Sequence, residues 1–254
     1  MPEIILEGRD LSRHFGALRA VDGVSLQIEA GPLHSIIGHN GAGKTTLFNL
    51  LSCYFPPTSG KIFLHGKDIT NTPVHRIAHL GLGRSFQITN VFPNLSVLEN
   101  ARLAAQAMGK HNLNFWNEGL KIKEYMERAR QAIKQVGLDG KENLLASVLP
   151  HGDKRKLELA ILLASNPQVL LLDEPTAGMA SEQVPHFLDV IHSIRDNGKK
   201  TIVLVEHNMS VVMSISDRIT VMHQGKLLAE GTPKEITANE AVQKAYLGES
   251  GITG

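Results

Sequence analysis

The sequence has a single cysteine, few aromatic residues and no excess of charge of either sign. One cysteine in 254 residues, Cys53, excludes an internal disulfide framework and is typical of a small core residue in a reducing compartment. Lys and Arg number 26 against 25 Asp and Glu, a balance that argues against nucleic acid as the main partner. No apolar run approaches the ~20 residues that span a bilayer, and no signal-peptide pattern is visible. We therefore expect a soluble, cytoplasmic protein.

What the sequence does contain is a glycine-rich phosphate-binding motif. Residues 38–45 match G-x-x-x-x-G-K-[ST], with an apolar strand-like run before them and an amphipathic helical pattern after them. Glycines let main-chain N–H groups surround a phosphate chain, and a helix starting at Gly43 adds the positive end of its dipole. A glycine-rich turn with a chance lysine would not explain these flanking patterns. The predicted ATP-binding residues of the motif are Gly38, His39, Asn40, Gly41, Ala42, Gly43, Lys44, Thr45 and Thr46.

An acidic pair follows an apolar strand-like run later in the chain. Residues 169–172 lead directly into Asp173 and Glu174. Asp173 is placed to hold Mg²⁺ opposite Thr45, and Glu174 is placed to deprotonate a water that attacks the γ-phosphate. Lys44 is expected to reach the β- and γ-phosphates. Without the phosphate motif, a helix cap or a solvated loop would be the simpler interpretation of the pair. Together, the two motifs predict a nucleotide site.

Hydrophobic patterning predicts an α/β fold. Residues 3–30 alternate apolar and polar around a break at Phe15-Gly16, which indicates antiparallel strands. The apolar runs 169–172 and 201–205 suit strands buried on both faces of a parallel sheet, and 181–195 is typical of a crossover helix between them. We expect a P-loop NTPase core with a mainly parallel sheet, an N-terminal antiparallel β subdomain and a helical insertion.

The helical insertion is expected between Val91 and Val148. Apolar residues recur at helical spacing from Ile122 to Val136, and Gly137 is placed to end that helix. Packed core is the simpler explanation of this apolar stripe, and Asn114-Phe115-Trp116 is expected to form a loop or lid. The remaining patterns predict a strand and turn at 61–67, a hairpin over 218–230 that turns at Gln224-Gly225, and a final helix from about Asn239.

Two more polar residues follow predicted strands. Gln87 comes after Gly83-Arg84-Ser85-Phe86, and His207 comes after Val203-Leu204-Val205-Glu206. A glutamine can contact Mg²⁺ or the attacking water, and a histidine can donate to the γ-phosphate oxygens. Either residue taken alone has a structural role as its simpler explanation. The predicted catalytic residues are Glu174, His207 and Gln87, and the predicted Mg²⁺ ligands are Thr45, Gln87 and Asp173.

The order of these motifs resembles that in the ATP-binding subunits of ABC transporters. After the phosphate motif come Gln87, then 149–155, then 172–176, and finally Glu206-His207. The similarity extends over nearly the whole chain, and the combination of motifs is highly specific. The resemblance implies that Gln87 is the Q-loop glutamine, Glu174 the catalytic base and His207 the switch histidine.

Three segments narrow the resemblance to the ATPase subunits of branched-chain amino acid importers. They are residues 12–21, the sequence over 149–153, and the tail from Ile215 to Gly248. Urea and lipopolysaccharide transport ATPases share parts of this tail, so those solutes stay as alternatives. The family resemblance also implies that Phe15 stacks on adenine, a role that suits a flat aromatic face.

The signature motif departs from the family pattern, Leu-Ser-Gly-Gly-Gln. Pro150, His151 and Asp153 replace the serine, the first glycine and the glutamine. Proline offers a phosphate neither a hydroxyl nor an N–H, but it suits the entry to a helix whose N–H groups at Gly152 and Asp153 face the ATP of the opposite subunit. Asp153 is expected to help cap this helix while placing negative charge near the phosphate. We expect Pro150, His151, Gly152 and Asp153 to act in trans. His39 also departs from the pattern, where proline is common, and is expected to be solvated or packed in its loop.

These inferences predict a peripheral ATPase on the cytoplasmic face of the membrane, with ATP and Mg²⁺ as cofactors. Its expected partners are a second ATP-binding subunit, the same chain or a related one, and integral-membrane permease subunits. A periplasmic or external solute-binding protein is an indirect partner, and nucleic acid is not expected. Residues 1–254 are expected to form one nucleotide-binding domain. Within it, the ATP-binding core spans 1–90 and 165–231, the helical subdomain 91–164 and the C-terminal tail 232–254.

Two functions of another class compete with this prediction. A non-transport ABC ATPase acting in DNA repair or on ribosomes typically carries long coiled coils or two cassettes with a basic linker, and neither feature is present in the sequence. A nucleotide sensor that does not hydrolyse ATP would explain the altered signature. The intact Lys44, Asp173, Glu174 and His207 argue against a sensor.

Overall fold

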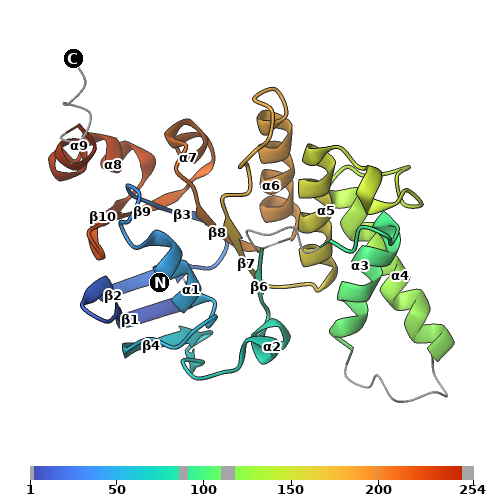
Figure 1. Ribbon diagram of the computed structural model, residues 1–254, viewed down its shortest axis with the longest axis horizontal. Helices are drawn as coiled ribbons and strands as arrows, with labels where there is room; N and C mark the ends of the chain where they lie inside the picture. Colours follow the sequence, from blue (N-terminus) through green and yellow to red (C-terminus); the bar gives the residue numbers. More distant parts are fainter. Residues whose placement is uncertain (1–2, 86–90, 110–117, 199, 248–254) are drawn as a thin grey trace. The chain divides into compact units, whose positions relative to one another are not determined.

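The computed structural model describes residues 3–85, 91–109, 118–198 and 200–247. It divides into two compact units, shown together in Figure 1. The first unit contains Met1–Leu80, Leu171–Glu174 and Thr201–Gly254, and the second contains Gly81–Leu170 and Pro175–Lys200. Each unit is described by itself.

An antiparallel sheet forms the beginning of the first unit (Figure 1). Its strands are β1 (Ile4–Phe15), β2 (Leu18–Glu29), β4 (Ser59–Leu64) and β5 (Lys67–Asp68), in the order β2-β1-β4-β5. The turn between β1 and β2 contains Gly16 at φ +59, and the turn after β4 contains Gly66 at φ +72. The predicted antiparallel β subdomain, with its break at Phe15-Gly16, is confirmed.

A second sheet of this unit is mainly parallel. In chain order its strands are β3 (Leu33–Ile37), β7 (Val169–Asp173, from Leu171), β8 (Thr201–Val205), β9 (Arg218–His223) and β10 (Lys226–Gly231). Strand β3 is central, parallel to both β8 and β9, and β10 pairs with β9 as the predicted antiparallel hairpin. Every residue of β3, β7 and β8 is buried. The apolar runs are therefore strands covered on both faces, as predicted.

Helices of the first unit follow their strands closely. Helix α1 (Lys44–Leu51) begins directly after Gly43, as expected, and Cys53 beyond its end is buried. Burial raises the pKa of the Cys53 thiol to about 12, which suits a core residue. The short α2 (Val74–Ile77) and a 3-10 turn, η1 (Ala78–Leu80), end this part of the chain.

Three helices cover the end of the first unit. They are α7 (Met209–Ile215), α8 (Pro233–Ala238) and α9 (Glu240–Leu247), and a buried cluster that includes Val212, Ile236 and Val242 packs them on β9. The predicted final helix is α9. Helices α7 and α8 were not predicted, although both have start signals: the Asn208 side chain accepts from the Ser210 N–H, and Thr232 and Glu235 form a capping box.

The second unit is largely helical. In it, β6 (Leu82–Arg84) lies beside the start of β7, where the Gln168 and Val169 N–H groups donate to the Gly81 carbonyl. Its helices are α3 (Val97–Ala107), α4 (Glu118–Gln135), the 3-10 turn η3 (Ala146–Val148), α5 (His151–Ala164) and α6 (Val184–Gly198). Helices α3, α4 and α5 pack side by side (Figure 1).

The helical insertion was predicted well. Ala129, Ile133 and Val136 are buried, so the apolar stripe is packed core, and Gly137 at φ +69 follows the end of α4. The crossover helix predicted at 181–195 is α6, which begins three residues later. The predicted loop or lid at Asn114-Phe115-Trp116 lies outside the described residues.

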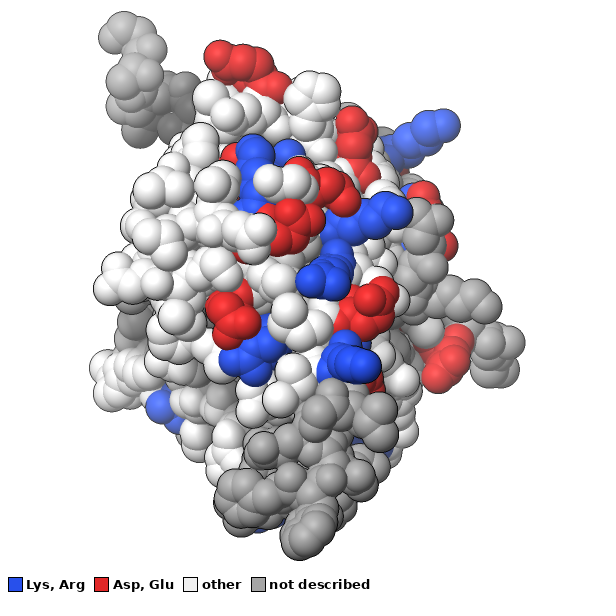
Figure 2. Space-filling model, turned by 90° about the vertical axis from the view of Figure 1, so that its right-hand side faces the viewer, with Lys and Arg blue, Asp and Glu red and all other residues white. Residues whose placement is uncertain are grey.

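Surface charge is mixed on the side of the molecule where α3 and α4 lie in Figure 1. Figure 2 shows Lys and Arg side chains interspersed with Asp and Glu on this face. Within α4, for example, Arg128 donates to Glu124 at 2.6 Å. In the parts of the chain that the structure describes, no helix is both long enough and apolar enough to cross a bilayer.

Candidate nucleotide-binding site

The phosphate-binding loop connects the end of β3 to the start of α1. Gly38, Gly41 and Gly43 have φ of +153, +79 and +98. A Cβ at Gly43 would lie 2.3 Å from the Ala20 carbonyl oxygen, and one at Gly38 would lie 2.4 Å from that of Met222. Positions 38 and 43 are therefore closed to any side chain by neighbouring backbone, whereas a Cβ at Gly41 would meet nothing within 4 Å.

Lys44 is held inside this loop. Only 7% of its side chain is exposed, and its Nζ donates to the carbonyls of Gly38 at 2.6 Å and His39 at 2.9 Å. Burial lowers the pKa of Lys44, and the nearby Glu174 and Asp173 carboxylates oppose that effect. The ammonium is thus fixed by main-chain carbonyls, with two acidic residues close enough to favour its charged form.

A cavity of about 500 Å³ opens over the loop, a size typical of small-ligand sites. Its lining residues are Leu18, Arg19, Ala20, Asn40, Gly41, Ala42, Gly43, Lys44, Thr45, Thr46, Glu174, Gln224 and Gly225. The loop from Asn40 to Thr46 is the predicted part of this lining. Gly38 and His39 lie beneath it and contribute the carbonyls that hold Lys44.

The hairpin turn at Gln224-Gly225 was predicted as a turn but not as part of the site. The Gly225 N–H donates to the Ala42 carbonyl at 3.0 Å, and the Gly225 carbonyl accepts from the Asp22 N–H at 2.9 Å. A Cβ at Gly225 would lie 2.8 Å from the Arg19 carbonyl oxygen. This turn therefore joins the phosphate-binding loop to β2. No local sequence signal indicates this, because it follows from the pairing of β9 with β3.

The predicted acidic residues and histidine meet at the ends of β7 and β8. Asp173 is the last residue of β7 and is buried, with 4% of its surface exposed. The Glu174 N–H donates to the Val205 carbonyl at 2.9 Å, and Glu174 Oε1 lies 3.6 Å from His207 Nδ1. Glu174 has φ +45, an unfavourable backbone conformation for a residue with a side chain. Such outliers persist where surrounding contacts define them, and they are frequent at functional sites.

The protein oxygens present here could hold Mg²⁺ only together with the phosphates of a nucleotide, as in other nucleotide-binding enzymes. Within the described residues, no group of three or more His, Cys, Asp or Glu side chains could hold a metal ion by itself. Mg²⁺ in such enzymes is held by one or two protein oxygens and by substrate phosphates. The exposed Thr45 hydroxyl and the Asp173 carboxylate are of that chemical type. Gln87, the third predicted ligand and a predicted catalytic residue, lies outside the described residues.

Phe15 does not line the cavity. Its side chain is 46% exposed at the end of β1, its ring meets that of Phe55 edge-on at 6.0 Å, and the Arg13 guanidinium lies 4.9 Å from its centre. The exposed ring is available to a ligand, and its role in adenine stacking stays a prediction.

His39 is half-buried and contacts the C-terminal helix. Its Nε2 lies 3.1 Å from the Ala245 carbonyl, and its ring is 4.4 Å from that of Tyr246. Burial raises the pKa of Tyr246 to about 12. His39 therefore packs the phosphate-binding loop against α9.

The signature segment forms a second small site, within the second unit. Helix α5 begins at His151 with Pro150 as its N-cap residue, as predicted. Gly152 is buried, and a Cβ there would lie 2.5 Å from the Gln183 Oε1 atom. A cavity of about 190 Å³ is lined by Pro150, Gly152, Asp153, Lys156, Met179, Gln183 and His186.

The carboxylate of Asp153 does not act as the expected helix cap. It accepts a hydrogen bond from Lys141 Nζ at 2.5 Å, so it forms an ion pair with a residue outside the helix. His151 and Arg155 instead contact the segment before α6: His151 Nε2 lies 3.5 Å from the Ala177 carbonyl, and the Arg155 guanidinium donates to the same oxygen at 3.3 Å.

Comparison with known proteins places this arrangement in a family. The model of the ABC transporter family matches residues 21–177, and that of the branched-chain amino acid ATP-binding cassette transporter matches residues 226–251. The chain is 40% identical to the high-affinity branched-chain amino acid transport ATP-binding protein BraF of Pseudomonas aeruginosa, over 98% of this chain and 100% of BraF. It is 38% identical to LivG of Escherichia coli K12, a protein with the same description, over 98% and 100%.

A solved structure agrees with these relatives. An ATP-binding cassette of an ABC transporter in its ADP conformation superposes with a TM-score of 0.83 at 27% identity, covering 96% of this chain and 99% of the other. The expected P-loop NTPase core and ABC ATPase fold are therefore confirmed.

Proposed function

Because the chain belongs to the family of ABC transporter ATP-binding subunits, we propose that it hydrolyses ATP to energise the import of branched-chain amino acids. The observation that carries the proposal is the cavity over the phosphate-binding loop, with the largely buried Lys44 and Glu174 both in its lining. The relatives BraF and LivG are both high-affinity branched-chain amino acid transport ATP-binding proteins.

The residues of this site have separate roles in the proposed reaction. The N–H groups of the loop and the Lys44 ammonium bind the β- and γ-phosphates. Thr45 and Asp173, with Gln87, hold Mg²⁺, which neutralises phosphate charge when bound. Glu174 accepts a proton from the attacking water, and its neighbour His207 donates to a γ-phosphate oxygen. Phe15 stacks on the adenine.

The second unit contributes to an ATP site in trans. In this proposal, Pro150, His151, Gly152 and Asp153 face the nucleotide of a second ATP-binding subunit, where the N–H groups at the start of α5 favour a phosphate. Closure of the two subunits around ATP transmits the conformational change to membrane partners. We propose the same division of the chain as above: core over 1–90 and 165–231, helical subdomain over 91–164 and tail over 232–254.

An exposed apolar surface of the second unit is the proposed contact with a permease subunit. Its members, called here the apolar surface, are Phe92, Leu144, Leu145 and Val148, with exposures of 58%, 45%, 46% and 65%. Backbone hydrogen bonds connect the two chain segments: the Val97 N–H donates to the Leu144 carbonyl, and the Ser147 N–H to that of Pro93. Exposed apolar side chains on two segments joined in this way favour a protein interface.

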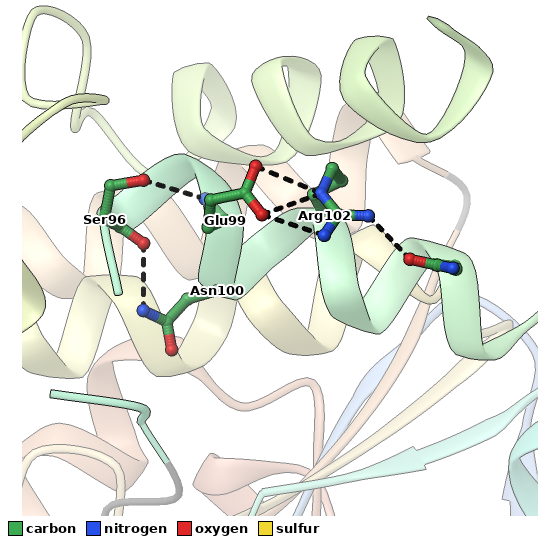
Figure 3. Close-up of polar contacts among 5 residues, drawn as sticks. Ser96, Glu99, Asn100 and Arg102 are labelled. Carbon is green, nitrogen blue, oxygen red and sulfur yellow. Dashed lines mark hydrogen bonds and ion pairs between the residues drawn. The ribbon is translucent and has the colours of Figure 1, made fainter. Parts of the chain in front are cut away.

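The segment that carries Phe92 is hydrogen-bonded to the start of α3, where Figure 3 shows the polar contacts of Ser96, Glu99, Asn100 and Arg102. Asn100 on α3 is buried, accepts from the Phe92 N–H at 2.8 Å, and donates to the Ser96 carbonyl at 2.9 Å. Ser96 caps α3 by accepting from the Glu99 N–H, and the Arg102 guanidinium donates to the Glu99 carboxylate. A preformed loop loses little entropy on binding, which favours a docking role.

The test is transport by the assembled complex. The chain is expressed with its neighbouring permease genes, reconstituted in vesicles and given ATP, while uptake of labelled leucine, isoleucine and valine is compared with uptake of urea. We expect ATP-dependent uptake of the branched-chain amino acids alone. Uptake of urea alone would correct the solute, and absence of nucleotide binding by the purified chain would refute the ATPase itself.

The location of the complex is tested in the same preparation. We propose that the chain sits on the cytoplasmic face of the membrane, bound through the apolar surface, and that a periplasmic or external solute-binding protein delivers the amino acid. Phe92→Asp should release the chain from the membrane fraction while ATP binding stays unchanged, because the cavity residues belong to the other unit. Retention of the variant on the membrane would contradict this contact.

A further inference from the structure

Asp153 is a substitution that places a negative charge on the first turn of α5. Its side chain is only 16% exposed, and it lines the small cavity with Gly152 and Lys156. A carboxylate near a helix N-terminus is stabilised by the dipole, but it also competes with any anion that approaches the same N–H groups. If the carboxylate stayed uncompensated, the start of α5 would repel a phosphate.

Lys141 supplies the missing positive charge from outside the helix. Its Nζ donates to Asp153 Oδ2 at 2.5 Å, and its side chain is 40% exposed. The backbone that carries Lys141 is fixed on both sides: its N–H donates to the Leu138 carbonyl, and its carbonyl accepts from the Leu144 N–H. Leu138 is completely buried, so this turn is anchored in the core of the second unit.

Another cation near the start of α5, Arg155, has a different carboxylate partner. Arg155 pairs with Glu158 at 2.9 Å and donates to the Ala177 carbonyl. Lys156 lines the small cavity itself and adds a positive charge there. With Asp153 paired to Lys141, the Lys156 ammonium and the helix N–H groups remain as positive groups at this cavity.

We propose that Lys141 is a positioning residue for ATP hydrolysis, which neutralises Asp153 so that the start of α5 accepts the terminal phosphate of ATP bound to a second ATP-binding subunit. This inference rests on the proposed function. In the common signature, position 153 is an uncharged glutamine, so no charge has to be neutralised there. In this chain Lys141 neutralises the charge of Asp153 instead. The lysine acts through Asp153 and need not touch the nucleotide.

The test measures closure of two ATP-binding subunits without hydrolysis. In a Glu174→Gln background, ATP-dependent association is followed by sedimentation for Lys141→Ala, Lys141→Arg, Asp153→Asn and the Lys141→Ala, Asp153→Asn double variant. We expect Lys141→Ala to raise the ATP concentration for half-maximal association by at least about tenfold, because an unpaired carboxylate then faces a phosphate. Lys141→Arg should stay near the parent, and the double variant should recover to within about threefold of Asp153→Asn alone.

Whether ATP-dependent association recovers in the double variant distinguishes neutralisation of Asp153 from a purely structural role of Lys141. If Lys141 only tethered its turn to α5, removing both partners would leave association as weak as in Lys141→Ala. The defect of Lys141→Ala should also shrink as salt rises past about 0.1 M, where the Debye length is about 10 Å. A defect that persists in the double variant, or no defect in Lys141→Ala, would overturn the inference.

Failure of the proposed function would look different. If the Glu174→Gln parent binds ATP but shows no association with itself or within the reconstituted transporter, then the arrangement in trans is wrong and the inference falls with it. If the parent associates and Lys141→Ala behaves like it, only the inference is wrong. Thermal unfolding of each variant checks that the second unit stays folded.

Discussion

The phosphate-binding loop of the first unit and the start of α5 in the second unit are both expected to contact phosphate, but they are built differently. The loop is shaped by backbone: Gly38 and Gly43 approach neighbouring carbonyls so closely that no side chain fits. The start of α5 is shaped by side chains, with Asp153 held by Lys141 and Ala177 contacted by His151 and Arg155.

This difference explains why one motif is intact and the other altered. A backbone cradle tolerates no substitution at its tight positions, because the obstacle is another main chain that cannot move. A site made from side-chain charges can change one residue when another compensates for it. The two regions should therefore respond differently to substitution, with large losses in the first and small, compensable ones in the second.

The largest effect is expected at the catalytic end of the first region. Glu174→Gln removes the proposed proton acceptor, whose Oε1 lies 3.6 Å from His207 Nδ1, and should lower turnover by roughly 10²–10⁴ while ATP affinity stays unchanged. Phosphate release and equilibrium nucleotide binding measure the two quantities. Glu240→Gln, an exposed carboxylate on α9 that pairs only weakly with Lys244 at 3.7 Å, is the matched control and should be silent. Hydrolysis near the parent rate in Glu174→Gln would remove this role from Glu174.

Two glycine variants test whether backbone crowding defines the loop. Gly43→Ala forces a Cβ against the Ala20 carbonyl, whereas Gly41→Ala, also at a positive φ, places its Cβ in free space. We expect Gly43→Ala to destabilise the protein by about 3 kcal/mol or more and to abolish ATP binding, and Gly41→Ala to cost about 1 kcal/mol. Urea unfolding with nucleotide titration is the measurement. If both variants lost the same stability, the positive φ, and not contact with neighbouring backbone, would be what excludes a side chain from the loop.

Acid should lower the free energy of unfolding through His34, which lies in the strand that leads into the loop. His34 in β3 is buried, its Nε2 lies 2.7 Å from the Thr220 hydroxyl, and desolvation, with a smaller contribution from Arg218, lowers its pKa from 6.5 to about 4. Because the unfolded chain gains a proton on His34 near pH 6.5 and the folded chain does not, stability contributed by neutral His34 is complete above that pH. It is lost progressively as pH falls to about 4, by roughly 3 kcal/mol.

The His34→Gln variant isolates this contribution, since its amide can still bond to Thr220. Unfolding free energies measured from pH 7 to pH 4 should fall less steeply in the variant than in the parent, by the same roughly 3 kcal/mol. Parallel pH profiles would show that other groups cause the acid sensitivity.

The smallest effect is expected at the start of α5. Asp153→Gln restores the common signature residue, and we expect hydrolysis to be unchanged or up to about threefold faster, because Lys141 already neutralises Asp153 in the parent. Steady-state phosphate release by the assembled transporter measures it. A clear loss of activity would mean that the carboxylate itself contributes to the site.

Local signals in the sequence predicted most of the fold and one half of the candidate site. The phosphate motif, the buried strands before it and before Asp173, and the hairpin at Gln224-Gly225 were found from spacing and turn chemistry alone. Helices α7 and α8 were missed although Asn208 and Thr232 cap them, because short helices have too few residues to show a hydrophobic period.

Contacts between distant segments could not be predicted in this way. The Gln224-Gly225 turn lies in the wall of the cavity because β9 pairs with β3, which is a property of the sheet and not of the turn. Lys141 reaches Asp153 because α4 ends in a turn that packs beside α5, and nothing in either segment signals the other. His39 likewise meets Tyr246, more than two hundred residues away in the chain.

By itself, the sequence indicated the family and the phosphate-binding motif and supplied the candidate site residues, since these inferences depend on residue type at short, fixed spacing. Only the tertiary structure decided which charges compensate one another and which turns line the cavity. Pairing of strands and packing of helices bring together residues that no local pattern connects, and electrostatic interactions depend on that proximity in space.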